Sequence, residues 1–219
     1  MPFAVIFDMD GVIADTNPTH LVSWKEYLLE NNITATDADL VIHMFGKSNT
    51  YILEYFFKRK MEREEIERRQ WEKEGLFRKM YEPIVEPLNG LLAFIDDLKA
   101  NGVKTGIATS APVHNLDMML RKVDLRSKME SLLSWEDVVN HKPAPDVYLQ
   151  SAKNVGVPIE NCVVFEDSTS GIQAGLAAGA KVVGVLTSHQ PSELPICHAY
   201  IENYEALDYA FIKKLFHEN

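Results

Sequence analysis

A short apolar segment that ends in two aspartates limits the folds open to this chain more than any other feature. Residues 3–7, Phe-Ala-Val-Ile-Phe, are apolar at consecutive positions, which is typical of a strand buried on both faces of a parallel sheet. Asp8 and Asp10 follow directly, and Gly11 allows the backbone to turn away. Because buried carboxylates repel one another and are costly to desolvate, we expect a cation between them. Taken alone, the pattern is also compatible with a turn whose side chains cap backbone amides.

The composition is that of a globular protein with one ordinary domain, or with a core domain that carries a smaller insertion. The 219 residues include 46% hydrophobic and 25% charged residues. The formal net charge of -10 argues against nucleic acid or an acidic membrane as a partner. Cys162 and Cys197 are the two cysteines, and neither a leader pattern nor an apolar stretch of about 18 residues is present, so we expect a cytoplasmic protein with free thiols.

The order of the expected elements divides the chain into a core and a helical insertion. Residues 16–83 carry helical patterns only, whereas residues 84–219 alternate helices with strands. This alternation predicts an α/β fold, in which residues 1–15 and 84–219 form a Rossmann-like parallel sheet with helices on both faces. Helices are expected at 17–30, 37–45, 48–60, 62–81, 90–100, 113–123, 145–155 and 169–178, and strands at 103–109, 131–134, 162–166, 181–186 and 199–201, before a closing helix.

The last helical segment of the insertion, residues 62–81, is rich in charged residues. Its alternating charges predict a solvated face and not a binding site. Its apolar side chains are the candidates for the buried face: Ile66, Trp71, Leu76, Phe77 and Met80.

Hydroxyl groups and one lysine stand at positions suited to a phosphate. Thr109 and Ser110 end the expected strand at 103–109 just before a helix, and a hydroxyl beside free helix amides can cradle a phosphate. Lys142 precedes Pro143, which favours an extended backbone there. The alternatives are ordinary helix capping for Ser110 and a surface position for Lys142.

A second carboxylate pair, Glu166 and Asp167, ends the expected strand at 162–166. Capping of the next helix by Asp167 or Ser168 is the alternative interpretation. Because the carboxyl ends of parallel strands converge on one edge of a sheet, we expect these residues to meet Asp8 there. Carboxylates, hydroxyls and a lysine gathered in this way describe a magnesium-dependent site for phosphoryl transfer.

Four short motifs, in this order along the chain, resemble those of the haloacid dehalogenase superfamily. They are Asp8-Met9-Asp10-Gly11-Val12, Ala108-Thr109-Ser110, Lys142-Pro143 and Glu166-Asp167. The resemblance covers the whole core, and the insertion, residues 16–83, is similar to the helical cap domain of type one members. Within the superfamily the chain is most similar to sugar-phosphate phosphatases and beta-phosphoglucomutases.

The resemblance implies a role for each matched carboxylate. Asp8 would be the nucleophile that forms an aspartyl-phosphate, and Asp10 would be the general acid and then the general base. Mg²⁺ would be held by Asp8, by Asp167 and by the backbone carbonyl of Asp10. Glu166 would support these ligands and reach the metal through water.

The resemblance also implies residues that bind the substrate. Thr109, Ser110 and Lys142 would hold the oxygens of the transferring phosphoryl group. In related enzymes the cap reaches over the site, and the cap residues expected to select the substrate are His20, Trp24, Gly46 and Lys47. An ordinary packed or solvent-facing histidine is the alternative for His20.

The expected function is therefore hydrolysis of a small phosphorylated metabolite, a sugar or polyol phosphate, by a monomeric magnesium-dependent phosphatase. Asp10 argues against dehalogenation, which needs no proton for the leaving group. A phosphomutase similar to beta-phosphoglucomutase is the alternative, although Phe45 and Asn49 stand where basic residues flank the glycine of mutases. A non-enzymatic phospho-receiver or binding module is a further alternative, but receivers carry their phosphoacceptor after a later strand.

Overall fold

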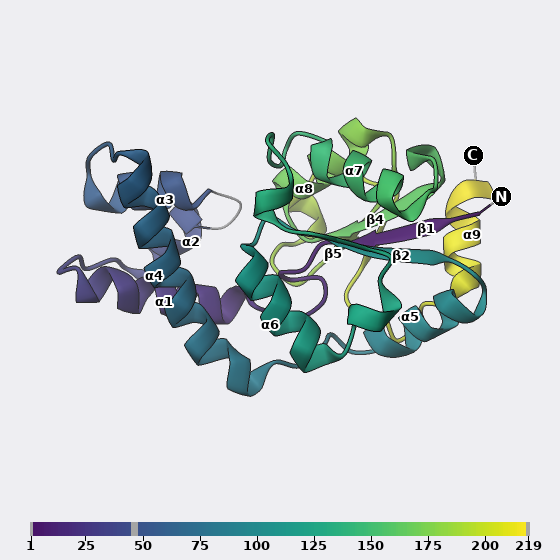
Figure 1. The fold of residues 1–219 in the computed structure, drawn as a ribbon, viewed down its shortest axis with the longest axis horizontal. Helices are drawn as coiled ribbons and strands as arrows, with labels where there is room; N and C mark the ends of the chain where they lie inside the picture. The colour runs from purple at the N-terminus through teal and green to yellow at the C-terminus, as the bar shows by residue number, and fades with distance from the viewer. Residues whose placement is uncertain (1, 45–47, 218–219) are drawn as a thin grey trace. The chain divides into compact units, whose positions relative to one another are not determined.

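The computed structural model describes residues 2–44 and 48–217, and the chain divides into two compact units (Figure 1). The first unit comprises Met1–Asp15 and Glu86–Asn219, and the second comprises Thr16–Val85. The β-sheet belongs to the first unit. The role of the second unit as a cap stays a prediction.

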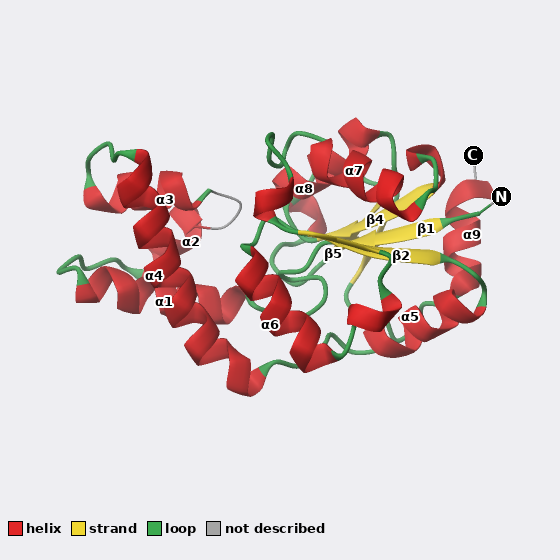
Figure 2. Cartoon of the chain, in the orientation of Figure 1, coloured by secondary structure: helices red, strands yellow, loops and turns green. Residues whose placement is uncertain are grey.

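A six-stranded parallel sheet forms the centre of the first unit (Figure 2). Its strands stand in the spatial order β3-β2-β1-β4-β5-β6. Their bounds are β1 Ala4–Phe7, β2 Lys104–Ala108, β3 Ser131–Leu133, β4 Cys162–Glu166, β5 Lys181–Val185 and β6 Ala199–Ile201. In β1, Val5 pairs with Thr105 of β2 on one side and with Val163 of β4 on the other. The predicted α/β fold is confirmed, and the carboxyl ends of the central strands share one edge.

Helices cover both faces of this sheet. Helices α7 and α8 lie on one face, α5 and α6 lie on the other, and α9 lies beside α5 (Figure 1). Side chains alternate between the faces, so Ile6 joins the apolar cluster that contains Tyr148 of α7, whereas Phe7 packs against Phe94 of α5. The bounds are α5 Leu91–Ala100, α6 Val113–Val123, α7 Asp146–Val155, α8 Thr169–Ala178 and α9 Tyr209–His217.

The second unit is helical throughout its described secondary structure. Its apolar core includes Trp24 and Leu28, together with Leu53 from a later helix. The helix predicted to reach residue 60 ends earlier, because Lys58 adopts a left-handed backbone with φ of 55°. The bounds are α1 Asn17–Glu30, α2 Asp37–Met44, α3 Asn49–Phe57 and α4 Arg63–Tyr81, followed by a 3₁₀ turn at Glu82–Ile84.

Helix α4 buries two of its charged residues, which therefore do not belong to the predicted solvated face. Lys73 and Glu74 are 1% and 4% exposed, whereas Trp71, a candidate for the buried face, is 57% exposed. Lys73, Phe77 and Tyr81 recur every four residues and share the buried stripe of the helix, from which Trp71 is displaced. The Lys73 Nζ lies 2.9 Å from the Glu74 Oε1, and this pairing makes the burial of both charges tolerable.

The first unit closes on itself where the chain leaves for the insertion and returns from it. The backbone amide of Leu88 donates a hydrogen bond to the carbonyl of Ile13 at 2.9 Å. The chain therefore leaves the core after Asp15 and re-enters it at Glu86, at points that are close together in space.

Candidate active site

Strand β1 delivers Asp8 to the carboxyl edge of the sheet. The backbone amide of Asp8 donates to the carbonyl of Phe165 in β4 at 2.9 Å, which continues the ladder one residue beyond β1. The side chain is buried, and this burial raises the pKa of Asp8 well above its usual value. Lys142 lowers the pKa of Asp8, while the charges of Glu166 and Asp167 raise it further. A further cation beside Asp8 would stabilise the ionised carboxylate.

The ammonium group of Lys142 uses its three donors on three acceptors. Its Nζ lies 2.6 Å from the Asp8 Oδ1, 2.8 Å from the Glu166 Oε1 and 3.1 Å from the carbonyl of Ala108. Burial alone would lower the pKa of Lys142, but the carboxylates of Asp8 and Glu166 raise it above its usual value. Lys142 is therefore a fixed positive charge, and the alternative of a surface lysine is wrong. The peptide bond to Pro143 is cis.

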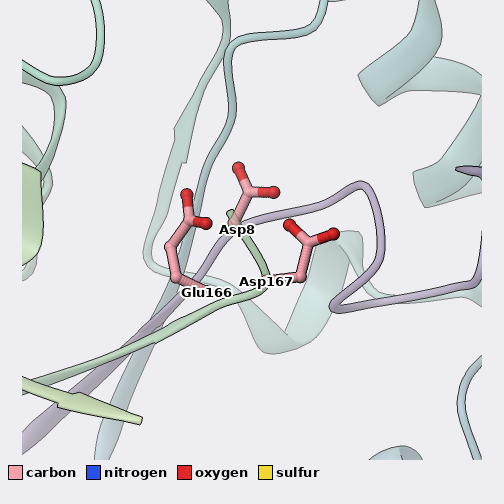
Figure 3. Close-up of side chains that lie close together, drawn as sticks. All are labelled: Asp8, Glu166 and Asp167. Atoms are coloured by element: carbon pink, nitrogen blue, oxygen red, sulfur yellow. The ribbon is translucent and has the colours of Figure 1, made fainter. Parts of the chain in front are cut away.

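Three carboxylates gather at this edge of the sheet. Asp8, Glu166 and Asp167 are buried, and each offers an oxygen within 4.8 Å of the others. Figure 3 shows Glu166 and Asp167 on either side of Asp8, with the three carboxyl groups turned the same way. Carboxylate oxygens are the ligands that hard divalent cations prefer. The donor set fits a divalent metal ion.

Glu166 differs from its two neighbours because protein donors already occupy both of its oxygens. Its Oε1 accepts from Lys142 at 2.8 Å and from the Tyr148 hydroxyl at 2.9 Å, while its Oε2 accepts from the amide and the hydroxyl of Ser168, each at 2.9 Å. A carboxylate has about four acceptor positions. A Cβ on Gly171 would overlap the Glu166 carboxylate, so glycine is required there to leave it room. Asp8 and Asp167 therefore fit direct metal ligation better than Glu166 does.

Two residues that were not predicted from the sequence, Thr187 and Ser188, hold Gly11 and Asp167 in place. The hydroxyl of Ser188 donates to the Oδ2 of Asp167, and the hydroxyl of Thr187 donates to the carbonyl of Gly11 at 2.6 Å. Both residues lie just beyond the carboxyl end of β5. The signal was available, because Thr187 and Ser188 are polar residues directly after a buried strand, as Asp8 is.

Thr109 and Ser110 lie at the same edge, in different environments. Thr109 is buried, and its hydroxyl accepts a hydrogen bond from the amide of Ala111 at 3.0 Å. Ser110 is exposed, and the N-cap position of α6 is Pro112, whose side chain makes no capping hydrogen bond. Of the capping alternatives, the one that holds is Ser168, whose hydroxyl accepts from the backbone at the start of α8.

Asp10 lies in the turn that follows Asp8. The amide of Gly11 donates to the carbonyl of Ala14 at 2.9 Å, and Asp10 forms a short parallel bridge with Ala14. The chain thus reverses directly after Asp10, whose side chain is half-buried. The role of Asp10 as acid and base stays a prediction.

The predicted cap residues that can be described, His20 and Trp24, both pack near Lys73 of the second unit. The ring of His20 stacks on Phe77 with centroids 3.8 Å apart, and its Nδ1 lies 2.8 Å from the Lys73 Nζ. Trp24 is buried, with the Lys73 ammonium 5.0 Å from its ring centroid. Outside the described residues lie Phe45, Gly46 and Lys47.

Comparison with known proteins decides the family. Residues 5–185 match the haloacid dehalogenase-like hydrolases. The chain belongs to this family. This haloacid dehalogenase-like hydrolase is 33% identical over 183 residues to the fructose-1-phosphate phosphatase YqaB of Escherichia coli (strain K12), across 83% of this chain and 95% of that protein. It is 28% identical over 191 residues to the beta-phosphoglucomutase of Bacillus subtilis (strain 168), across 83% of this chain and 82% of that protein.

A solved structure with a similar fold comes from Entamoeba histolytica HM-1:IMSS. It is described as a HAD hydrolase, family IA, variant 3, and it matches this hydrolase with a TM-score of 0.93 and 26% identity over 100% of both chains. The predicted resemblance to the haloacid dehalogenase superfamily and the prediction that the chain is a hydrolase are confirmed.

Proposed function

We propose that this hydrolase is a magnesium-dependent phosphatase that cleaves a small phosphorylated metabolite, a sugar or polyol phosphate, through an aspartyl-phosphate. The observation that carries the proposal is the environment of Asp8. Its Oδ1 lies 2.6 Å from the Lys142 Nζ, and its carboxylate stands beside that of Asp167. Asp8 thus has a fixed cation on one oxygen and an anionic neighbour with which it can share a metal ion.

In the first step, Asp8 attacks the phosphorus of the bound ester. A bond forms between a carboxylate oxygen of Asp8 and phosphorus, the bond from phosphorus to the ester oxygen breaks, and Asp10 gives its proton to the departing alcohol. Lys142 attracts the transferring oxygens, since unit charges about 4 Å apart attract by roughly 4 kcal/mol at an effective dielectric of 20. Thr109 and Ser110 hold the same oxygens through hydroxyl and amide hydrogen bonds.

In the second step, Asp10 takes a proton from the water that attacks the aspartyl-phosphate. The bond between phosphorus and the Asp8 oxygen breaks, and inorganic phosphate leaves. Asp8, Asp167 and the backbone carbonyl of Asp10 would hold Mg²⁺, while Glu166 supports the site through Lys142. When bound, Mg²⁺ would offset the negative charge that otherwise keeps a phosphate ester away from a carboxylate.

The substrate class rests on relatives named for phosphorylated sugars, a fructose-1-phosphate phosphatase and a beta-phosphoglucomutase. The residues proposed to select the substrate belong to the cap: His20, Trp24, Gly46 and Lys47.

The proposal leaves out nucleic acid and membranes as partners, in keeping with the net charge of -10. Across residues 2–44 and 48–217, no helix combines the length and apolarity needed to cross a bilayer. A monomer in the cytoplasm remains part of the proposal.

Phosphate release from a panel of sugar and polyol phosphates, with Mg²⁺ and with a chelator, tests this function. We expect release that depends on Mg²⁺ and that Asp8→Asn abolishes. Asp117→Asn is the matched control, because Asp117 forms an exposed ion pair with Arg126 on the protein surface, and we expect this variant to keep the wild-type rate. If Asp8→Asn retains most of the activity, the assignment of the nucleophile is wrong.

The same assay separates a phosphatase from a phosphomutase. A mutase would convert one sugar phosphate into another without net release of phosphate and would need a bisphosphate activator. Asn49, at a position that is basic in the mutases, donates instead to the Glu74 carboxylate at 3.2 Å. This uncharged side chain favours the phosphatase, because a mutase must hold a second phosphate.

A further inference from the structure

We propose that Tyr148 is a positioning residue, which holds Glu166 and through it fixes the ammonium group of Lys142 on Asp8. The inference rests on the phosphatase function proposed above. Tyr148 lies in α7 and is fully buried. Its hydroxyl donates to the Oε1 of Glu166 at 2.9 Å.

Packing of the Tyr148 ring does not require its hydroxyl group. Tyr148 belongs to an apolar cluster that includes Ile6, Ala108 and Val164, in which a phenylalanine ring would occupy the same space. A hydroxyl placed in such surroundings costs free energy unless it is hydrogen-bonded. What the oxygen of Tyr148 adds to the ring is the hydrogen bond to Glu166.

Tyr148 acts on both members of the adjacent ion pair. The Glu166 Oε1 that accepts from Tyr148 also accepts from the Lys142 Nζ at 2.8 Å. The same Nζ lies 4.8 Å from the centroid of the Tyr148 ring, within range of a cation–π interaction. The contacts therefore run without a gap from Tyr148 through Glu166 and Lys142 to the Oδ1 of Asp8.

The remaining contacts of Glu166 explain why the hydroxyl matters. Ser168 holds only the Oε2, through its amide and its hydroxyl. Without the Tyr148 hydroxyl, the Oε1 would keep Lys142 as its one protein donor among these, and the carboxylate could rotate about the Oε2 that Ser168 holds. Lys142 would then lose the partner that fixes its position, and a small misplacement of a charged group beside the reacting atoms lowers the rate strongly.

The experiment compares wild type, Tyr148→Phe, Glu166→Gln and the double variant by steady-state phosphate release. We expect Tyr148→Phe to lower kcat about tenfold while KM stays within about twofold. In the Glu166→Gln background, Tyr148→Phe should cause no further loss, because the hydroxyl acts through Glu166. Tyr200→Phe is the matched control, since its hydroxyl donates to the carbonyl of Pro195 at 2.8 Å, and it should leave kcat unchanged.

A wild-type kcat in Tyr148→Phe, or losses that multiply in the double variant, would overturn the inference. Metal-free crystal structures of Tyr148→Phe and Glu166→Gln provide a readout that does not need activity. We expect the Lys142 Nζ to leave hydrogen-bond reach of the Asp8 Oδ1 in both variants, and an unchanged lysine in either overturns the inference even if the other variant does not fold. If wild type releases no phosphate, the proposed function fails, and these structures still decide the role of Tyr148.

Discussion

The backbone of Gly11 lies so close to the side chain of Asp167 that a Cβ at position 11 would stand 2.6 Å from the Asp167 Cγ. Gly11 also has a φ of +72°, a conformation that strains any other residue. The turn after Asp8, the proposed nucleophile, can therefore lie against Asp167, the proposed metal ligand, because Gly11 has no side chain.

Gly11→Ala is therefore expected to lower kcat more than about tenfold by displacing Asp167. Gly156→Ala is the matched control, because Gly156 has a φ of +71° and nothing within 4 Å of a Cβ. Backbone strain should cost both variants about 1 kcal/mol of stability. Thermal melting and phosphate release separate the two effects, and equal activities in the two variants would contradict the fit of Gly11 to Asp167.

Gly171→Ala is expected to abolish most activity, because its Cβ would overlap the Glu166 carboxylate and push it off Lys142. Gly75→Ala is the control for a helical glycine, since the nearest atom to its Cβ would be 3.7 Å away in the Arg78 side chain. The better helix propensity of alanine should stabilise Gly75→Ala by up to about 1 kcal/mol. Wild-type activity in Gly171→Ala would show that Glu166 has room to move without consequence.

Ser188→Ala should raise the Mg²⁺ concentration needed for half-maximal activity about tenfold, because the Ser188 hydroxyl orients the Asp167 carboxylate. Titration of phosphate release with Mg²⁺ measures the change. Ser151→Ala serves as the control, since its buried hydroxyl donates to the Ser131 hydroxyl at 3.1 Å and touches no carboxylate of the site. An unaltered Mg²⁺ requirement in Ser188→Ala would rule out this orienting role.

Lys73→Met should destabilise the protein by about 3–5 kcal/mol, because it leaves the charge of Glu74 buried without the Lys73 ammonium. The double variant Lys73→Met with Glu74→Leu should recover most of this loss. Lys25→Met is the control, because the Lys25–Asp37 pair is exposed and such pairs contribute about 1 kcal/mol or less. Urea unfolding of the full chain gives the comparison, and equal losses for Lys73→Met and Lys25→Met would contradict it.

Glu130 supplies a pH-dependent contribution to stability. Burial alone would raise the pKa of Glu130, but hydrogen bonds from Lys99 and from the amide of Thr105 lower it below its usual value. The stabilisation is thus complete above the unfolded pKa of about 4.3 and is lost as the pH falls through the folded pKa. Glu130→Gln should lower the unfolding free energy by about 1–2 kcal/mol at pH 7 and by little near pH 2. A difference that does not change with pH would contradict this assignment.

Local sequence patterns were sufficient for the sheet and for the main acidic residues of the site. Strands buried on both faces are apolar at consecutive positions, so a strand within residues 3–7 could be identified without any partner strand, and the structure places it at Ala4–Phe7. Strand-end placement then located Asp8 and Asp167, and the structure brings their carboxylates together.

The features that could not be predicted depend on contacts between distant segments. Tyr148 lies 18 residues from Glu166 along the chain, and the residues around Tyr148 do not predict its hydrogen bond to that carboxylate. The buried Lys73 ammonium forms an ion pair with Glu74 and a cation–π contact with the ring of Trp24, which belongs to another helix. Helix periodicity alone treats such a lysine as solvent-facing.

The hydrogen bond between Leu88 and Ile13 joins the two segments of the core that flank the insertion. The chain leaves the core and returns to it at neighbouring points. We therefore expect an inserted segment of another length to fit there without shifting the register of any strand. With the proposed substrate-selecting residues in the insertion and the proposed catalytic residues in the core, we expect changes within one continuous stretch of sequence to alter the substrate while the reaction is kept.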